Sequence, residues 1–192
     1  MVRIEVKKDQ YKLLHPRPVY VIAAGRFGKE VNVMAASWVS PVSDEPPKLA
    51  LAMWKGNYTY NLIEKYGEFT VNIMSSNDID KIFYVGSVSG RNIDKLASVK
   101  WSIAKGKKVN APYITESMGH IECTVTNKVD CNEEVLYIAD IVYAEVEEKY
   151  YNVRYGWDLR VALIPLHVVG KAFTKPESKF VFAKSISLTR KK

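Results

Sequence analysis

NVMAASWVSPVSDEPPKLALAMWKGNYT, residues 32–59, is the stretch of this sequence that decides its fold. It opens with a strand whose two alternating faces both carry apolar residues, a pattern typical of a strand buried on both faces or lining a pocket. A loop rich in proline follows at 40–48 and is predicted to lie on the surface without strand pairing. A second apolar run, Leu49–Trp54, leads to Asn57 or Thr59, either of which can cap a helix. The unpaired N–H groups at such a helix start can hold a phosphate.

The rest of the chain is predicted to consist mainly of strands joined by short turns. Apolar or alternating runs predict strands at 19–24, 68–73, 119–129, 135–146 and 161–169. Helical spacing predicts a helix at 57–66, a second one beginning at Asn77, and a short helical turn at 91–96. Antiparallel strands in this number avoid open edges by closing into a barrel. The sequence therefore predicts a mainly β fold, an antiparallel barrel with two or three inserted helices.

The strand at 119–129 alternates more regularly than any other. Ile121 and Cys123 lie on its apolar side, whereas His120 and Glu122 lie on its polar side. This pattern predicts a half-buried strand with a solvent-facing polar side. Cys123 is then a buried free thiol, and the two cysteines of the chain do not indicate a metal site.

Length and composition indicate one globular domain spanning residues 1–192. Hydrophobic residues make up 47% of the chain and charged residues 26%, which is ordinary for a globular protein. No apolar run approaches the roughly 20 residues of a membrane helix, and the first ten residues lack the apolar core of a signal peptide. We therefore expect a cytoplasmic protein with no membrane partner.

The formal net charge of +7 raises the question of nucleic-acid binding. The lysines are scattered, and no stripe of lysine and arginine interleaves with aromatic residues, so nucleic acid is not the expected partner. The same charge suits an anionic cofactor such as a flavin or pyridine nucleotide.

Residues for acid–base or nucleophilic catalysis are scarce. No catalytic triad is evident, no G-x-G-x-x-G follows a strand, and the three histidines lie far apart in the sequence. We therefore expect either a binding protein or an enzyme whose cofactor performs the difficult step.

Several segments together suggest what that cofactor is. They are the opening stretch, FTVNI at 69–73, GSVSGRNIDK at 86–95 and the strand around Ile121–Cys123. In order and spacing they resemble the flavin reductase-like, FMN-binding split-barrel family, which includes flavoredoxin-type proteins. The resemblance extends from Arg17 to Phe173 and implies a split β-barrel, a Greek-key antiparallel barrel that binds FMN.

The resemblance also implies a site. Main-chain groups of the first strand and its following loop would meet the isoalloxazine edge of FMN, at Ser37, Trp38, Val39 and Ser40. Thr59 would bind the phosphate, with Met53, Trp54, Lys55 and Asn57 along the approach, and Arg91, Lys95 and Phe173 near the flavin. Alternatives remain open, because Trp38 could be a core residue, Thr59 an ordinary helix cap, and Lys55 and Lys95 solvent-facing lysines.

For function, the resemblance implies a flavin reductase that takes a hydride from NADH or NADPH and passes electrons to an acceptor. The alternatives are a non-enzymatic FMN electron carrier and a split barrel that binds another small molecule. The resemblance implies a homodimer with the flavin near the subunit interface, and it allows for a redox partner protein. Relatives often carry a histidine where this chain has Asn132, Glu133 and Glu134, which leaves the choice of electron donor open.

Overall fold

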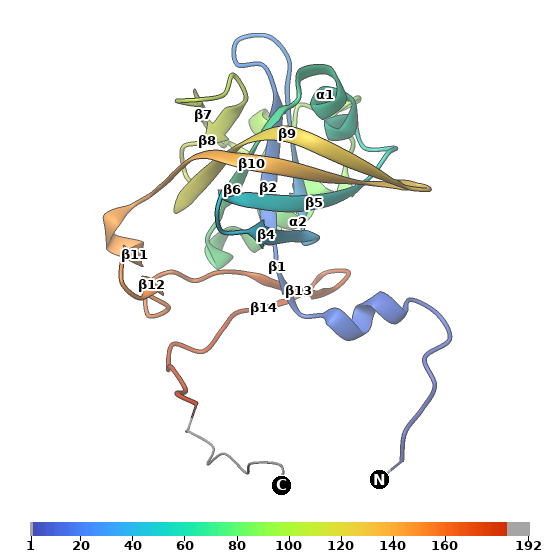
Figure 1. Cartoon of the computed structure of the whole chain (residues 1–192), viewed down its shortest axis with the longest axis vertical. Helices are drawn as coiled ribbons and strands as arrows, with labels where there is room; N and C mark the ends of the chain where they lie inside the picture. Colours follow the sequence, from blue (N-terminus) through green and yellow to red (C-terminus); the bar gives the residue numbers. More distant parts are fainter. Residues whose placement is uncertain (1, 184–192) are drawn as a thin grey trace, which may run out of the picture.

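A computed structural model describes residues 2–183 of the chain (Figure 1). Its helices are α1 (Tyr58–Tyr66), α2 (Ile79–Ser87) and α3 (Lys95–Val99), with single 3-10 turns at Gln10–Leu14, Ser76–Asp78 and Glu148–Tyr150. The longer strands are β2 (Tyr20–Gly25), β3 (Val31–Ala36), β4 (Val39–Ser43), β5 (Lys48–Trp54), β6 (Glu68–Ile73), β9 (Gly119–Cys131) and β10 (Glu134–Val146). The shorter strands are β1 (Arg17–Pro18), β7 (Ile103–Lys105), β8 (Pro112–Ile114), β11 (Tyr151–Asn152), β12 (Gly156–Trp157), β13 (Leu166–Val169) and β14 (Ala172–Thr174). Among the described residues, no helix is long and apolar enough to span a membrane.

The seven longer strands form one antiparallel sheet in the order β3-β2-β6-β9-β10-β5-β4. Its two terminal strands, β3 and β4, are consecutive in sequence and separated only by Ser37 and Trp38. The three Cα–Cα steps from Ala36 to Val39 span about 11 Å at most, so the two terminal strands of the sheet must come close together at this crossing. The N–H of Ala52 in β5 donates to the carbonyl of Trp38 at 2.9 Å, which ties the crossing to the far edge. The sheet therefore closes on itself, and the predicted barrel is confirmed.

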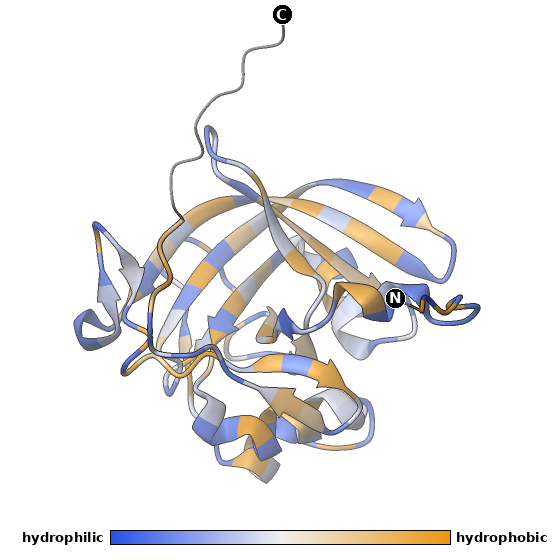
Figure 2. Ribbon diagram, turned by 90° about the horizontal axis from the view of Figure 1, so that it is seen from below, coloured by the Kyte–Doolittle hydropathy of each residue, from blue (hydrophilic) through white to orange (hydrophobic). Residues whose placement is uncertain are grey.

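β2 and β3 are buried on both faces, as their double apolar pattern predicts. One face packs inside the barrel, where Ile22 belongs to a cluster that also contains Leu51, Phe69 and Cys123. Leu62 of α1 joins this cluster, so α1 covers part of the barrel interior. The other face belongs to a second cluster, formed with α2, α3, β7 and β8. Figure 2 shows the curved sheet with hydrophobic and hydrophilic residues alternating along its strands.

Three local predictions need correction. Residues 40–48 do not form an unpaired loop, because Pro41 lies in β4 opposite Leu49. β4 ends the sheet, and an edge strand tolerates a proline. The strand predicted at 161–169 is confined to β13, preceded by a turn in which the Val161 N–H donates to the Asp158 carbonyl. The helical turn expected at 91–96 starts later, at α3, where the Asp94 carboxylate caps the Ala97 N–H.

The polar side of β9 is also buried at its first half, which differs from the predicted solvent-facing side. Glu122 is fully buried, and its carboxylate accepts the N–H groups of Lys107, Lys108 and Val109 at 2.6–3.0 Å. His120 lies beside it, 3.3 Å from Nε2 to the carboxylate. Burial alone would raise the pKa of Glu122, but these hydrogen bonds outweigh it and lower the pKa. The loop at 105–111 therefore covers this face and folds around the Glu122 carboxylate.

Candidate functional site

The start of α1 has hydrogen-bonding capacity that no side chain uses. Asn57 precedes the helix in an extended conformation, yet its side chain caps no N–H, and the first turn contains no acidic residue. The first N–H groups of a helix lack partners within the helix and carry a partial positive charge. This end of α1 can therefore accept an anion.

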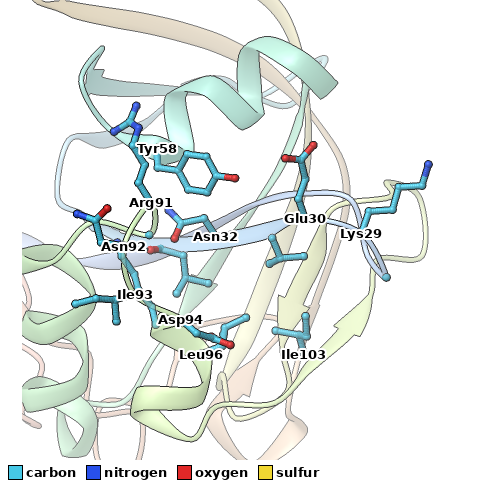
Figure 3. Close-up of a pocket in the computed structure, with 15 residues that line it drawn as sticks. Lys29, Glu30, Asn32, Tyr58, Arg91, Asn92, Ile93, Asp94, Leu96 and Ile103 are labelled. Atoms are coloured by element: carbon cyan, nitrogen blue, oxygen red, sulfur yellow. Dashed lines mark hydrogen bonds between the residues drawn. The ribbon is translucent and has the colours of Figure 1, made fainter.

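Arg91 adds a cation to the same place. Its guanidinium donates to the carbonyl of Gly56 at 2.8 Å and lies 5.6 Å from the ring centroid of Tyr58 (Figure 3). The chain reaches this position because Gly90 packs directly on Asn32, where a Cβ atom would lie 2.0 Å from the amide oxygen. The segment that contains Arg91 is thus held against β3 and the start of α1. The family resemblance implied that both the stretch at 32–59 and the segment at 86–95 lie near the flavin.

Thr59 lies behind this surface. Its side chain is fully buried, and its hydroxyl accepts a hydrogen bond from the Asn32 amide at 2.8 Å. The hydroxyl proton makes no hydrogen bond among the described residues, so Thr59 retains a donor. Asn32 and Tyr58, which were not among the predicted site residues, therefore complete this end of the site.

Below the α1 start lies a cavity of about 560 Å³ between β3 and the segment at 90–96 (Figure 3). Lys95 borders it but does not present its charge there. The Lys95 ammonium is buried and donates to the carbonyls of Val33 and Val85, at 2.9 and 2.7 Å. Burial lowers the pKa of Lys95 to about 8. Lys95 therefore joins the open edge of β3 to the end of α2. The sequence suggested instead that Lys95 lies near the flavin or faces solvent, and neither interpretation included this role.

A second hollow, of about 270 Å³, contains two predicted flavin contacts, Ser37 and Phe173. It lies between the end of β3, one side of α2 and the β13–β14 hairpin. A Cβ atom on Gly86 would lie 3.0 Å from that of Ala35, so the glycine lets α2 approach β3 closely. The remaining lining residues are Val19, Ala35, Ala36, Ile82, Phe83, Gly86, Ser87, His167 and Gly170. Small residues and aromatic rings together make a slot suited to a flat ring; we refer to this hollow as the ring slot.

The crossing between β3 and β4 borders this slot. Trp38 is 36% exposed and makes an edge-to-face contact with Tyr11, with ring centroids 5.5 Å apart. This exposure favours a ligand contact over a place in the core. Val39 and Ser40 instead line a third hollow, at the mouth of the barrel. The four predicted ring contacts thus follow the crossing but do not all line one cavity.

The remaining predicted residues lie along the end of β5 and differ in exposure. Met53 is buried in the barrel core, whereas Trp54 is 54% exposed. Lys55 donates to the carboxylate of Asp130, at the end of β9, at 2.7 Å. It also donates at 2.5 Å to the carbonyl of Asn132, in the turn between β9 and β10. The hydrogen bond from Lys55 lowers the pKa of Asp130. Lys55 is thus engaged by this turn, and the cation at the α1 start is Arg91.

Comparison with known proteins agrees with this geometry. A family model described as a flavin reductase like domain matches residues 12–157. An uncharacterized protein of Pyrococcus abyssi is 31% identical over 143 residues, which cover 74% of this chain and 81% of that protein. The solved structure of a flavoredoxin from Methanosarcina acetivorans is similar with a TM-score of 0.82 and 27% identity, over 95% of each chain. The flavoredoxin of Desulfovibrio vulgaris (Miyazaki F) has a TM-score of 0.82 and 25% identity, over 94% of this chain and 97% of that one.

Proposed function

The chain belongs to the flavin reductase-like domain family, and on this premise we propose that it binds FMN and transfers a hydride from NADH or NADPH to the flavin. Electrons then pass from the flavin to an acceptor. The observation that carries the proposal is the uncapped start of α1 with Arg91 fixed beside it. The two flavoredoxin structures that resemble the chain support a flavin as its cofactor.

The α1 start fits the phosphate of FMN. A phosphate monoester carries between one and two negative charges at neutral pH. The helix N–H groups and the Arg91 guanidinium offer it hydrogen-bond donors from two sources. The Thr59 hydroxyl, buried behind them, is bonded to the Asn32 amide. No carboxylate occupies the first turn of the helix to compete for these donors.

The ring slot fits the isoalloxazine. Ser37 and Phe173 line it, and Trp38 lies at the crossing next to Ser37. FMN, when bound, supplies the chemistry of accepting a hydride and releasing electrons. The residues that line the slot would orient the isoalloxazine ring and exclude water from part of it, while the α1 start would hold the phosphate at the other end of FMN.

Hydride transfer has a direct test. Protein loaded with FMN, mixed anaerobically with NADH or NADPH, should lose its oxidised-flavin absorbance much faster than free FMN at the same concentration. The measurement is stopped-flow absorbance at about the flavin maximum. A purified chain that stays colourless after incubation with FMN would contradict the proposal that it binds this cofactor.

A second candidate function is that of an electron carrier, favoured by the resemblance to two flavoredoxins. In the same experiment, a carrier would be bleached by a reduced partner protein and not by either nicotinamide.

We further propose that the chain forms a homodimer with the flavin near the subunit interface. Trp38 in the β3–β4 crossing and Trp54 at the end of β5 both expose large apolar side chains, and two-fold dimers are the commonest assembly of soluble proteins. Light scattering should give twice the chain mass of 21.8 kDa. A 21.8 kDa species that still holds FMN tightly would contradict the proposal.

A further inference from the structure

The small sheet β1-β13-β14 carries a row of residues that the proposed function does not use. Arg17, His167 and Phe173 are direct partners across its three strands. Residues directly opposite one another in an antiparallel sheet project from the same face. His167 and Phe173 both line the ring slot, and their ring centroids lie 5.2 Å apart. The row therefore brings a cation and an imidazole next to a predicted flavin contact.

His167 is held in place from two sides. Its Nε2 lies 3.2 Å from the carbonyl of Gly170, which can only accept, so Nε2 carries a proton. Its Nδ1 makes no hydrogen bond within residues 2–183. On the other side, His15 lies 5.5 Å from the His167 ring, and its Nδ1 donates to the His167 carbonyl at 3.2 Å.

These contacts belong to a continuous series of aromatic rings. Trp38, Tyr11, His15, His167 and Phe173 follow one another with centroids 5.5, 6.1, 5.5 and 5.2 Å apart. All four distances lie in the range of favourable aromatic pairs. The series starts and ends at residues that are predicted to face the flavin, and His15 has a buried Nε2 without a partner. His167 is thus part of a built wall and not a loose surface residue.

The charge of the row is available to a ligand. Arg17 makes no salt bridge or hydrogen bond with any residue in the described part of the chain, although its side chain is only partly exposed. Lys95, the cation expected near the flavin, has its ammonium bound to two carbonyls instead. Lys171 adds a further cation nearby, with its ammonium 5.6 Å from the ring centroid of Phe83, which lines the slot. Within the β1-β13-β14 row, His167 lines the slot itself and Arg17 stands beside His167.

We propose that Arg17 and His167 form the positive edge of the ring slot and stabilise FMN in its reduced state, in which the ring gains negative charge. The inference rests on the proposed binding of FMN. His167 lines the slot and would contact the ring. Arg17, its direct partner on β1, would act through its charge. The row forms and breaks no covalent bond, and the electrons come from the nicotinamide or another reductant. It changes how tightly reduced FMN binds relative to oxidised FMN.

The test compares the affinities of the full chain for oxidised and reduced FMN, measured by titration and by the reduction potential of bound FMN against a redox dye. His167→Gln should reduce the preference for reduced FMN roughly tenfold, as expected for loss of one contact to a charged group. Arg17→Gln should reduce the preference in the same direction by a smaller factor, because Arg17 is not among the lining residues and acts only through its charge. For a two-electron couple, tenfold corresponds to about 30 mV. Arg17→Lys keeps the charge and should keep most of the preference.

Arg154→Gln is the matched control, because Arg154 is an exposed arginine stacked on Tyr155 in a separate hairpin. It should leave the preference unchanged. If both row variants bind oxidised FMN as the wild type does and keep its preference for reduced FMN, the inference is wrong and FMN binding stands. If the wild type binds neither form, the proposed function fails and the inference fails with it. If a row variant weakens both forms equally, the row shapes the slot and does not set its charge.

Discussion

Glu122→Ala should lower the free energy of unfolding by about 3–5 kcal/mol, because it leaves the N–H donors that the carboxylate now binds without an acceptor. The Glu122 carboxylate is fully buried and accepts three consecutive backbone N–H groups, from residues 107–109. Each buried donor that loses its acceptor costs about 1–3 kcal/mol. Because a whole domain is stable by only about 5–15 kcal/mol, the urea midpoint should fall steeply.

Two further variants test whether the loss of stability is specific to the buried Glu122 carboxylate or follows from removing any glutamate. Glu116→Ala removes an exposed carboxylate that also accepts a backbone N–H, from Ser102 at 2.9 Å, and should cost less than about 1 kcal/mol. Glu122→Gln keeps the shape but turns one acceptor into a donor, so its cost should fall between the two. Equal urea midpoints for the two alanine variants would show that residues 105–111 do not depend on Glu122.

The pH dependence has a definite sign. The pKa of Glu122 is lowered in the folded chain, so its stabilising contribution is complete above the ordinary pKa of a glutamate. The contribution is lost as the pH falls through the lowered value. The wild type should therefore lose more stability on acidification than Glu122→Gln, which has no carboxylate to protonate. Parallel acid transitions of the two proteins would contradict this assignment.

Glu122 also shows where prediction from the sequence ends. Strict alternation in β9 correctly predicts a strand and its apolar side. The polar side of β9 is covered by β7, β8 and the loop that joins them. The sequence of these segments has little periodicity, so it does not indicate that they pack there. A carboxylate facing solvent and one facing backbone N–H groups look alike in a period-2 pattern, because the pattern contains no information about distant segments.

The barrel was more predictable, because local patterns and global closure agree there. Double-sided apolar patterns in β2 and β3 indicate burial on both faces, which the two core clusters confirm. Pro41 argued against pairing at 40–48, yet β4 accommodates it as an edge strand. Knowing that β4 ends the sheet requires the strand order, and the strand order is a tertiary property.

For the candidate site, the sequence motifs predicted which segments meet but not which side chains carry the charge. The α1 start and the segment around Arg91 do come together. Lys55 and Lys95 were equally reasonable cations, since a lysine has the same appearance in sequence whether it faces a ligand, a carboxylate or a carbonyl. The structure assigns Lys55 to Asp130 and Lys95 to Val33, which leaves Arg91 at the helix start.

Arg91→Ala should therefore weaken FMN binding about 10- to 100-fold, since a hydrogen bond to a charged group contributes roughly 1.5–3 kcal/mol and each decade corresponds to about 1.4 kcal/mol. Riboflavin has the same ring system without the phosphate, and its affinity should change little. Fluorescence titration with both ligands measures the two effects separately. Because Arg91 is exposed, the difference between the ligands should shrink as salt concentration rises.

Arg154→Ala is the matched control for Arg91→Ala, because its guanidinium lies 5.2 Å from the ring centroid of Tyr155, much as Arg91 lies over Tyr58. Both changes remove one positive charge and one arginine–tyrosine contact, but only Arg91 is next to the α1 start. Arg91→Lys should keep part of the FMN affinity, since lysine retains the charge without the planar fork of donors. If Arg91→Ala weakens FMN and riboflavin by the same factor, Arg91 supports the folding of the helix start through its bond to Gly56 and does not bind the phosphate. The α1 N–H groups would then have to hold the phosphate with no contribution from this arginine.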